Sequence, residues 1–228
     1  MFERFKKAFS RDAKDQVGAN SQLARGPVSE WAATQGFGFS VDGTGHGVSL
    51  EGQVRGRPWR LQLGSPSRHY IRGEELRARA ELGVKEDAAV LVMNRPLKEA
   101  LEKQAYEMYT DNLRTSADPR LPEEMRWLAM YDEVGWDKLP RDFWDRYGVL
   151  SERPQDAQDW IHPDLGRLML EWPDPAPSTE VPFMLLLMRG KVYLRMEYTP
   201  ADVSLLQHAA MIFTNACESA MDDWTAAA

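Results

Sequence analysis

The chain of 228 residues carries a net charge of −7, and 43% of its residues are hydrophobic. This hydrophobic content is enough to bury a core and excludes an intrinsically disordered protein. The negative charge argues against nucleic acid as a partner, because proteins that bind it gather positive charge toward the phosphate backbone. No apolar run approaches about 18 residues, so no membrane-spanning segment is predicted. The single cysteine excludes an internal disulfide and favours a reducing, cytoplasmic location.

Residues 1–11 are predicted to form a short amphipathic helix. Three phenylalanines fall on one side at helical spacing, and cations crowd the other side. This pattern is typical of a helix that lies on an anionic membrane surface, but the same stripe also fits a groove on a partner protein. A third interpretation is that the stripe packs on the chain's own core or on a second copy. The predicted docking residues are Phe2, Phe5, Lys6, Lys7 and Phe9.

The segment that follows is polar and predicts a tether. Residues 10–26 are rich in Asp, Asn, Gln, Ser and Gly and offer little to bury. We therefore divide the chain into an arm with its tether, residues 1–26, and a single α+β domain, residues 27–228. Within this domain we expect a helical insertion at about residues 116–164.

The first half of the domain is predicted to be mainly β-structure. Pro27 begins a short helix that ends before Gly36, and strands follow closely. Residues 74–82 have the composition of a helix but alternate like a strand, and we assign a strand because the neighbouring segments are strands. The expected strands are 37–41, 48–54, 59–63, 74–82 and 88–93, and a helix is expected at 96–109.

The middle of the chain is acidic and predicted to be helical, with helices at 122–134 and 140–147. Strands return at 166–172, 183–188 and 191–198. A helix that begins with Thr199 as its N-cap residue closes the chain. The sequence thus predicts an α+β fold with a mainly antiparallel sheet, a helical insertion and a long C-terminal helix.

Two segments of the chain resemble each other. Residues 54–66 and 188–200 align without gaps, and in each an Arg-Gly turn leads into a strand with an early aromatic residue. The similarity is either a coincidence, since such turns are common, or the trace of two related hairpin units.

The strongest candidate site is a cluster of arginines. Between Arg55 and Arg79 there are seven arginines and two glutamates. If the alternating apolar residues face the core, Arg60, Arg77 and Arg79 emerge together on the other face of the sheet, where guanidinium groups can bind phosphate or carboxylate. The alternative is that the acidic segment 118–159, with 11 acids and 6 bases, covers and neutralises this face. The candidate anion-binding residues are Arg60, Arg68, Arg72, Arg77 and Arg79.

Other motifs carry no chemistry of their own. The glycine-rich residues 43–47 are followed by a strand, so they predict a hairpin turn and not a phosphate loop. The four histidines lack metal-ligand spacing, and Cys217 lies on the apolar stripe of the last helix, where it is expected as a small core residue. We therefore expect neither a metal nor another cofactor.

These patterns favour a non-catalytic, cytoplasmic binding or adaptor protein that docks through residues 1–11. Its expected partner is a protein or an anionic membrane surface, with no role for nucleic acid, and self-association is left open. The alternative is an enzyme or an anionic-ligand-binding domain that uses the arginine cluster between Arg55 and Arg79.

Vesicle flotation tests the membrane role of the arm. If residues 1–11 anchor the chain to a membrane, the full chain floats with anionic but not neutral vesicles, and a chain that lacks residues 1–11 does not float. Added salt should weaken flotation, because each cation near an anionic surface contributes about 1 kcal/mol that salt screens. If the full chain stays unbound on anionic lipid, the phenylalanine stripe belongs to a protein interface.

Overall fold

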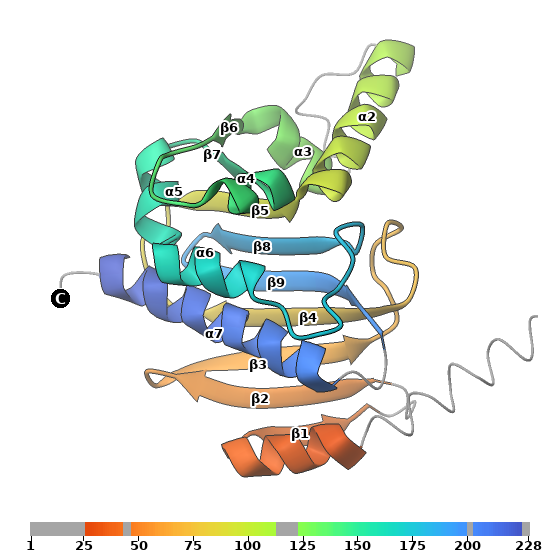
Figure 1. The fold of residues 1–228 in the computed structure, drawn as a ribbon, viewed down its shortest axis with the longest axis vertical. Coiled ribbons are helices and arrows are strands. Elements are labelled where there is room, and N and C mark those ends of the chain that lie inside the picture. Colours follow the sequence, from red (N-terminus) through yellow and green to blue (C-terminus); the bar gives the residue numbers. More distant parts are fainter. Residues whose placement is uncertain (1–25, 43–46, 113–122, 200–202, 225–228) are drawn as a thin grey trace, which may run out of the picture.

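The computed structural model describes residues 26–42, 47–112, 123–199 and 203–224. The predicted docking residues Phe2, Phe5, Lys6, Lys7 and Phe9 therefore lie outside the described residues. The described chain forms one nine-stranded sheet in which every neighbouring pair is antiparallel, with helices packed on it (Figure 1). This confirms the predicted α+β class.

The strand order across the sheet is β1-β2-β3-β4-β9-β8-β5-β7-β6. The strands are β1 (Gly38–Val41), β2 (Val48–Val54), β3 (Arg57–Gly64), β4 (Glu74–Glu81), β5 (Ala89–Asn94), β6 (Asp132–Val134), β7 (Tyr147–Ser151), β8 (Phe183–Met188) and β9 (Lys191–Tyr198). Residues 26–35 form a helix ahead of β1. The helices that follow are α2 (Arg95–Asn112), α3 (Glu123–Met130), α4 (Arg141–Arg146), α5 (Pro154–Trp160), α6 (Pro163–Leu170) and α7 (Val203–Trp224).

The two segments that resemble each other in sequence form equivalent hairpins. Arg55 and Gly56 join β2 to β3, and Arg189 and Gly190 join β8 to β9. All four residues have positive φ, between 48° and 79°, as the central pair of a tight type I′ hairpin turn requires. The two hairpins flank β4, which pairs with β3 on one side and with β9 on the other.

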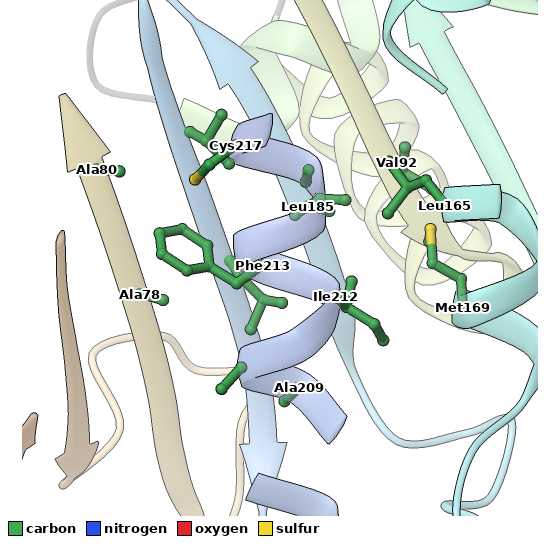
Figure 2. Close-up of a cluster of buried hydrophobic side chains, with 14 of the residues drawn as sticks. Ala78, Ala80, Val92, Leu165, Met169, Leu185, Ala209, Ile212, Phe213 and Cys217 are labelled. Carbon is green, nitrogen blue, oxygen red and sulfur yellow. The ribbon is translucent and has the colours of Figure 1, made fainter. Parts of the chain in front are cut away.

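One face of the sheet forms the larger core. Helix α7 lies across this face, and α4, α5 and α6 cover the part near β5 and β7 (Figure 1). The small residues Ala78 and Ala80 of β4 leave room for Phe213 of α7, whose ring lies over this strand in Figure 2. Cys217, one turn further along the same helix, is fully buried, so it is the core residue that the apolar stripe predicted.

The other face of the sheet is covered over only half of its width. Helices α2 and α3 pack on β5, β7 and β8 through a second cluster that includes Leu91, Leu150 and Trp127. Strands β5 and β8 are therefore buried on both faces, and they read as continuous apolar runs. In β9, by contrast, buried and half-buried residues alternate strictly, because only one of its faces is fully covered.

Two secondary-structure predictions were wrong. Residues 166–172, expected as a strand, lie mostly in α6, which begins with Pro163 and buries Leu165 and Met169 four residues apart on one side. The insertion at residues 116–164 was expected to be helical, but it also contributes β6 and β7 to the sheet. The five residues of β7 are all buried, and periodicity cannot distinguish so short an apolar run from a buried helix.

Glycine substitutions test the two hairpin turns against each other. At Gly56 (φ +79°) an added Cβ would meet nothing within 4 Å, whereas at Gly190 (φ +67°) it would lie 2.8 Å from the carbonyl oxygen of Val84. We expect Gly56→Ala to lower the free energy of unfolding by about 1 kcal/mol through backbone strain alone. Gly190→Ala should cost roughly twice as much or more, because backbone must also shift. Urea unfolding of both variants measures the difference, and equal losses would contradict this account.

Candidate functional site

A hollow of about 1260 Å³ lies on the sheet face opposite α7, over the half that α2 and α3 leave uncovered. Strands β2, β3, β4 and β9 form its floor. Strand β8 and helix α3 bound it on one side, and residues 35–38 line it at the other. Six arginines line it, against three glutamates. The arginines are Arg60, Arg68, Arg77, Arg79, Arg189 and Arg195, and the glutamates are Glu51, Glu81 and Glu123.

The register of the sheet places arginines directly opposite one another. Arg60 of β3 pairs with Arg79 of β4, and Arg77 of β4 pairs with Arg195 of β9. Directly opposed like charges destabilise a sheet, since their Cβ atoms lie only about 5 Å apart. The floor of the hollow thus holds two such pairs, one row apart along the strands, where a stability-driven sequence would place opposite charges.

The charges of the Arg60–Arg79 pair are only weakly neutralised. The Nε and Nη2 of Arg60 donate to Glu51 Oε1 at 2.9 and 2.5 Å, and Arg79 donates to Glu81 on its own strand. In both ion pairs each side chain is more than half exposed, so water screens the attraction and each contributes about 1 kcal/mol or less. The Arg79 guanidinium also lies 5.7 Å from the ring centroid of Tyr193, a contact that helps to orient it.

Arg77 has no ion pair and no hydrogen bond with any of the described residues. Its Nε is buried without a hydrogen-bond partner, in a floor where its cross-strand neighbours are Gln62 and Arg195. A buried N–H without an acceptor costs about 1–3 kcal/mol. Arg77 is therefore a cation of the hollow floor that no described carboxylate neutralises, and Arg189 at the rim is another.

Two buried carboxylates hold the arginines at the inner end of the hollow. Arg195 lies between Glu75 of β4, 2.6 Å from its Nε, and Glu124 of α3, which accepts from its Nη1 at 2.7 Å. Glu124 also accepts from Arg68 Nε at 2.5 Å and from the Tyr70 hydroxyl at 3.2 Å. We call these residues the inner ion cluster. It joins α3 to the sheet and so builds one wall of the hollow.

The protonation states of the inner ion cluster follow from burial and charge. Burial acts to raise the pKa of Glu124, but hydrogen bonds and the charges of Arg68 and Arg195 outweigh it, and the pKa is lowered. Burial and the neighbouring Glu124 charge raise the pKa of Tyr70. Glu124 is thus ionised and Tyr70 is a neutral donor at neutral pH, so the cluster is a fixed set of charges.

The structure brings together four of the five predicted anion-binding residues. Arg60, Arg68, Arg77 and Arg79 line the hollow, but Arg72 does not, and its backbone N–H donates to Glu197 Oε2 at 2.7 Å. The expected cover by the acidic segment 118–159 holds for Arg68, which pairs with Glu124. It does not hold among the described residues for Arg60 and Arg79, whose partners lie on β2 and β4, or for Arg77.

Sequence reasoning missed two further arginines of the hollow. The alternation of β9 places Arg195 opposite the buried Leu194 and Met196, so its outward direction was readable in the sequence. Arg195 lies beside Arg77 because β9 pairs with β4. This pairing joins residues more than 100 positions apart, and no pattern in the sequence indicates it. Arg189 reaches the hollow through the β8–β9 turn.

The described cysteine and histidines outside the hollow form no second reactive site. Burial raises the pKa of the Cys217 thiol, which makes it a poor nucleophile. His69, His162 and His208 each contact a different partner, Gln104, Asp223 and the Leu168 carbonyl. Within the described part of the chain, no group of three or more His, Cys, Asp or Glu side chains could hold a metal ion. None of the described helices is long and apolar enough to cross a bilayer.

Comparisons of the chain with protein-family models, with curated proteins and with solved structures find no match. The hollow and the sequence are therefore the features of the chain that bear on its function.

Glu124→Gln tests the inner ion cluster. Removing the carboxylate leaves Arg68 and Arg195 short of a buried counter-charge, so we expect the free energy of unfolding at neutral pH to fall by about 3–5 kcal/mol. Glu51→Gln, which breaks an exposed pair, is the matched control and should cost about 1 kcal/mol or less.

The stability lost in Glu124→Gln should depend on pH. The pKa of Glu124 is lower in the folded chain than in the unfolded chain, so its stabilisation is fully present above the unfolded pKa of about 4.3. It is lost as the pH falls through the folded pKa. The gap in unfolding free energy between the wild type and Glu124→Gln should therefore shrink on acidification below about pH 4.3. A gap that stays constant in urea unfolding from neutral to acidic pH would show that Glu124 is not held as an ion.

Proposed function

We propose that this chain is a binding protein whose arginine-lined hollow receives the anionic groups of its ligand. The observation that carries the proposal is Arg77, a cation without a partner among the described residues, set beside Arg79 and opposite Arg195. A carboxylate or phosphate placed over Arg77 would accept from its guanidinium and offset the repulsion between the facing arginines. The array costs stability when empty and is relieved when an anion is bound.

The chemistry of the lining supports binding over catalysis. The described residues that line the hollow include no serine, cysteine, histidine or lysine, and two of its three glutamates, Glu51 and Glu81, are held in ion pairs with Arg60 and Arg79. The arginines are charged at every physiological pH, so they recognise anions without moving protons.

The amphipathic pattern of residues 1–11 supports a second docking element in the same protein. Phe2, Phe5 and Phe9 with Lys6 and Lys7 fit a membrane surface or a groove on a partner protein. A cytoplasmic protein of this kind would be peripheral on the inner face of the membrane or attached to its partner, while the hollow remains open to a ligand. This role rests on the sequence alone.

Pyrophosphate is a simple probe of the hollow, because its two charged ends can reach neighbouring guanidinium groups. We expect it to bind the wild-type chain at millimolar concentration in isothermal titration calorimetry. Arg77→Gln should weaken binding about tenfold or more, since a charge-assisted hydrogen bond is lost. The same substitution should leave the melting temperature unchanged or raise it, because it removes a repulsive charge.

Arg72→Gln is the matched control, since it removes an arginine of the same sequence cluster that does not line the hollow. It should leave pyrophosphate affinity within about twofold at constant ionic strength. The proposal is contradicted if the wild type does not bind pyrophosphate, or if Arg77→Gln and Arg72→Gln bind it equally well.

A further inference from the structure

We infer that the ligand of the hollow is an acidic, amphipathic segment of a partner protein that docks across the open strands. This inference rests on the proposed function and specifies the class of ligand. Four features of the hollow support it: its size, the spacing of its cations, its apolar side and the acids around the cations.

The hollow is larger than a small anion or a single headgroup requires. Its volume of about 1260 Å³ exceeds the roughly 300–1,000 Å³ of a typical small-molecule pocket. The lining extends from β2 across β3, β4 and β9 to β8, which is about 19 Å at about 4.8 Å per strand. A helix with its side chains is about 10–12 Å wide and would rest within this width.

The cations are too far apart for a single oxyanion to bind all of them. Arg60 and Arg195 lie two strands apart and one row of side chains apart along the sheet, so their Cα atoms are separated by about 12 Å. Arg77 and Arg79 lie between them. Carboxylates four and seven residues apart on one face of a helix are separated by about 6 and 10 Å along its axis. Such a face would supply one acid to each of several arginines.

One side of the hollow is apolar. Met184, Leu186 and Trp127 line it there but are almost fully buried under α3, so the apolar side chains left partly open are Met188 of β8 and Tyr193 of β9. Methionine side chains adapt to varied surfaces and are common where proteins bind partner segments. A ligand that meets arginines over β3 and β4, and Met188 and Tyr193 beside them, would be acidic along one edge and apolar along the next, which describes an amphipathic segment.

The shape and the acids disfavour the two other large anionic partners. A bilayer surface is flat on this scale, and it cannot reach Arg77 in the floor of a hollow where Nε is buried. Nucleic acid carries unbroken negative charge, which Glu51, Glu81 and Glu123 in the lining would repel. A protein segment carries separate acids and can place bases or neutral residues opposite these glutamates.

A designed helical peptide is the probe for the experiment. It carries Glu at successive i, i+4 and i+7 positions, with Leu along the adjoining face and a fluorescein label. Two matched peptides replace every Glu by Lys or every Leu by Ser. Fluorescence anisotropy with the full chain should show that the Glu/Leu peptide binds at least about tenfold more tightly than either matched peptide and than pyrophosphate.

Variants of the full chain locate the binding. Arg77→Gln should weaken the binding of the Glu/Leu peptide about tenfold or more, and Arg72→Gln should leave its affinity unchanged. Met188→Ser tests the apolar side of the hollow and should also weaken the binding of this peptide. Met211→Ser is its control, because Met211 is 53% exposed on α7, on the opposite face of the sheet, and should have no effect. Vesicles of phosphatidylglycerol and a double-stranded DNA oligonucleotide should fail to displace the peptide from the hollow.

The outcomes separate this inference from the proposed function. If pyrophosphate binds in an Arg77-dependent way but the Glu/Leu peptide binds no more tightly than its Lys and Ser counterparts, the hollow binds anions and the peptide inference is wrong. Displacement of the peptide by vesicles or by DNA would also overturn it, in favour of that ligand. If neither pyrophosphate nor the peptide depends on Arg77, both proposals fail.

Discussion

The structure depends on one constraint: a sheet of nine strands has two faces, and the described helices cover one face over most of its strands and the other over only about half. Helix α7 and its neighbours seal one side of β2, β3, β4 and β9. On the opposite side α2 and α3 pack on β5, β7 and β8 and contact β9 only at its edge, through Glu124 and Arg195. An antiparallel sheet tolerates a solvated face, because its backbone hydrogen bonds are satisfied within the sheet and alternate side chains can be polar. The hollow lies over β2, β3, β4 and β9 because α2 and α3 do not extend across these strands.

Ion pairs, and not only apolar contacts, attach α3 to the sheet at the edge of the hollow. Glu124 lies at the start of α3, fully buried, and receives Arg68 and Arg195. Burying these charges is costly, and only close ion pairs with extra hydrogen bonds offset the cost. The same arginines then present their outer surfaces to the hollow. The inner ion cluster therefore both closes the core and defines where the cationic floor begins.

The floor itself combines groups that stability alone would keep apart. The Arg60–Arg79 and Arg77–Arg195 pairs face each other across strands, and the available carboxylates are either exposed, as Glu51 and Glu81, or already shared, as Glu75 and Glu124. Functional sites are where natural chains accept such local conflicts. A chain with a net charge of −7 that gathers arginines on one sheet face fits the proposal of a partner with discrete negative charges.

The sequence by itself determined the class of fold, the position of most strands and the direction of their side chains. The alternation of β3 and β4 is a local property, so Arg60, Arg77 and Arg79 could be assigned to one face before any contact was known. Neither β7 nor α6 was decidable locally, because β7 buries all five of its residues and the two turns of α6 are too short for their periodicity to distinguish a helix from a strand. Only the tertiary structure decided that β9 pairs with β4, that α3 contributes Glu124 to the inner ion cluster, and that Arg72 does not line the hollow. Each of these depends on contacts between segments far apart in the chain, and no local pattern of residues encodes such a pairing.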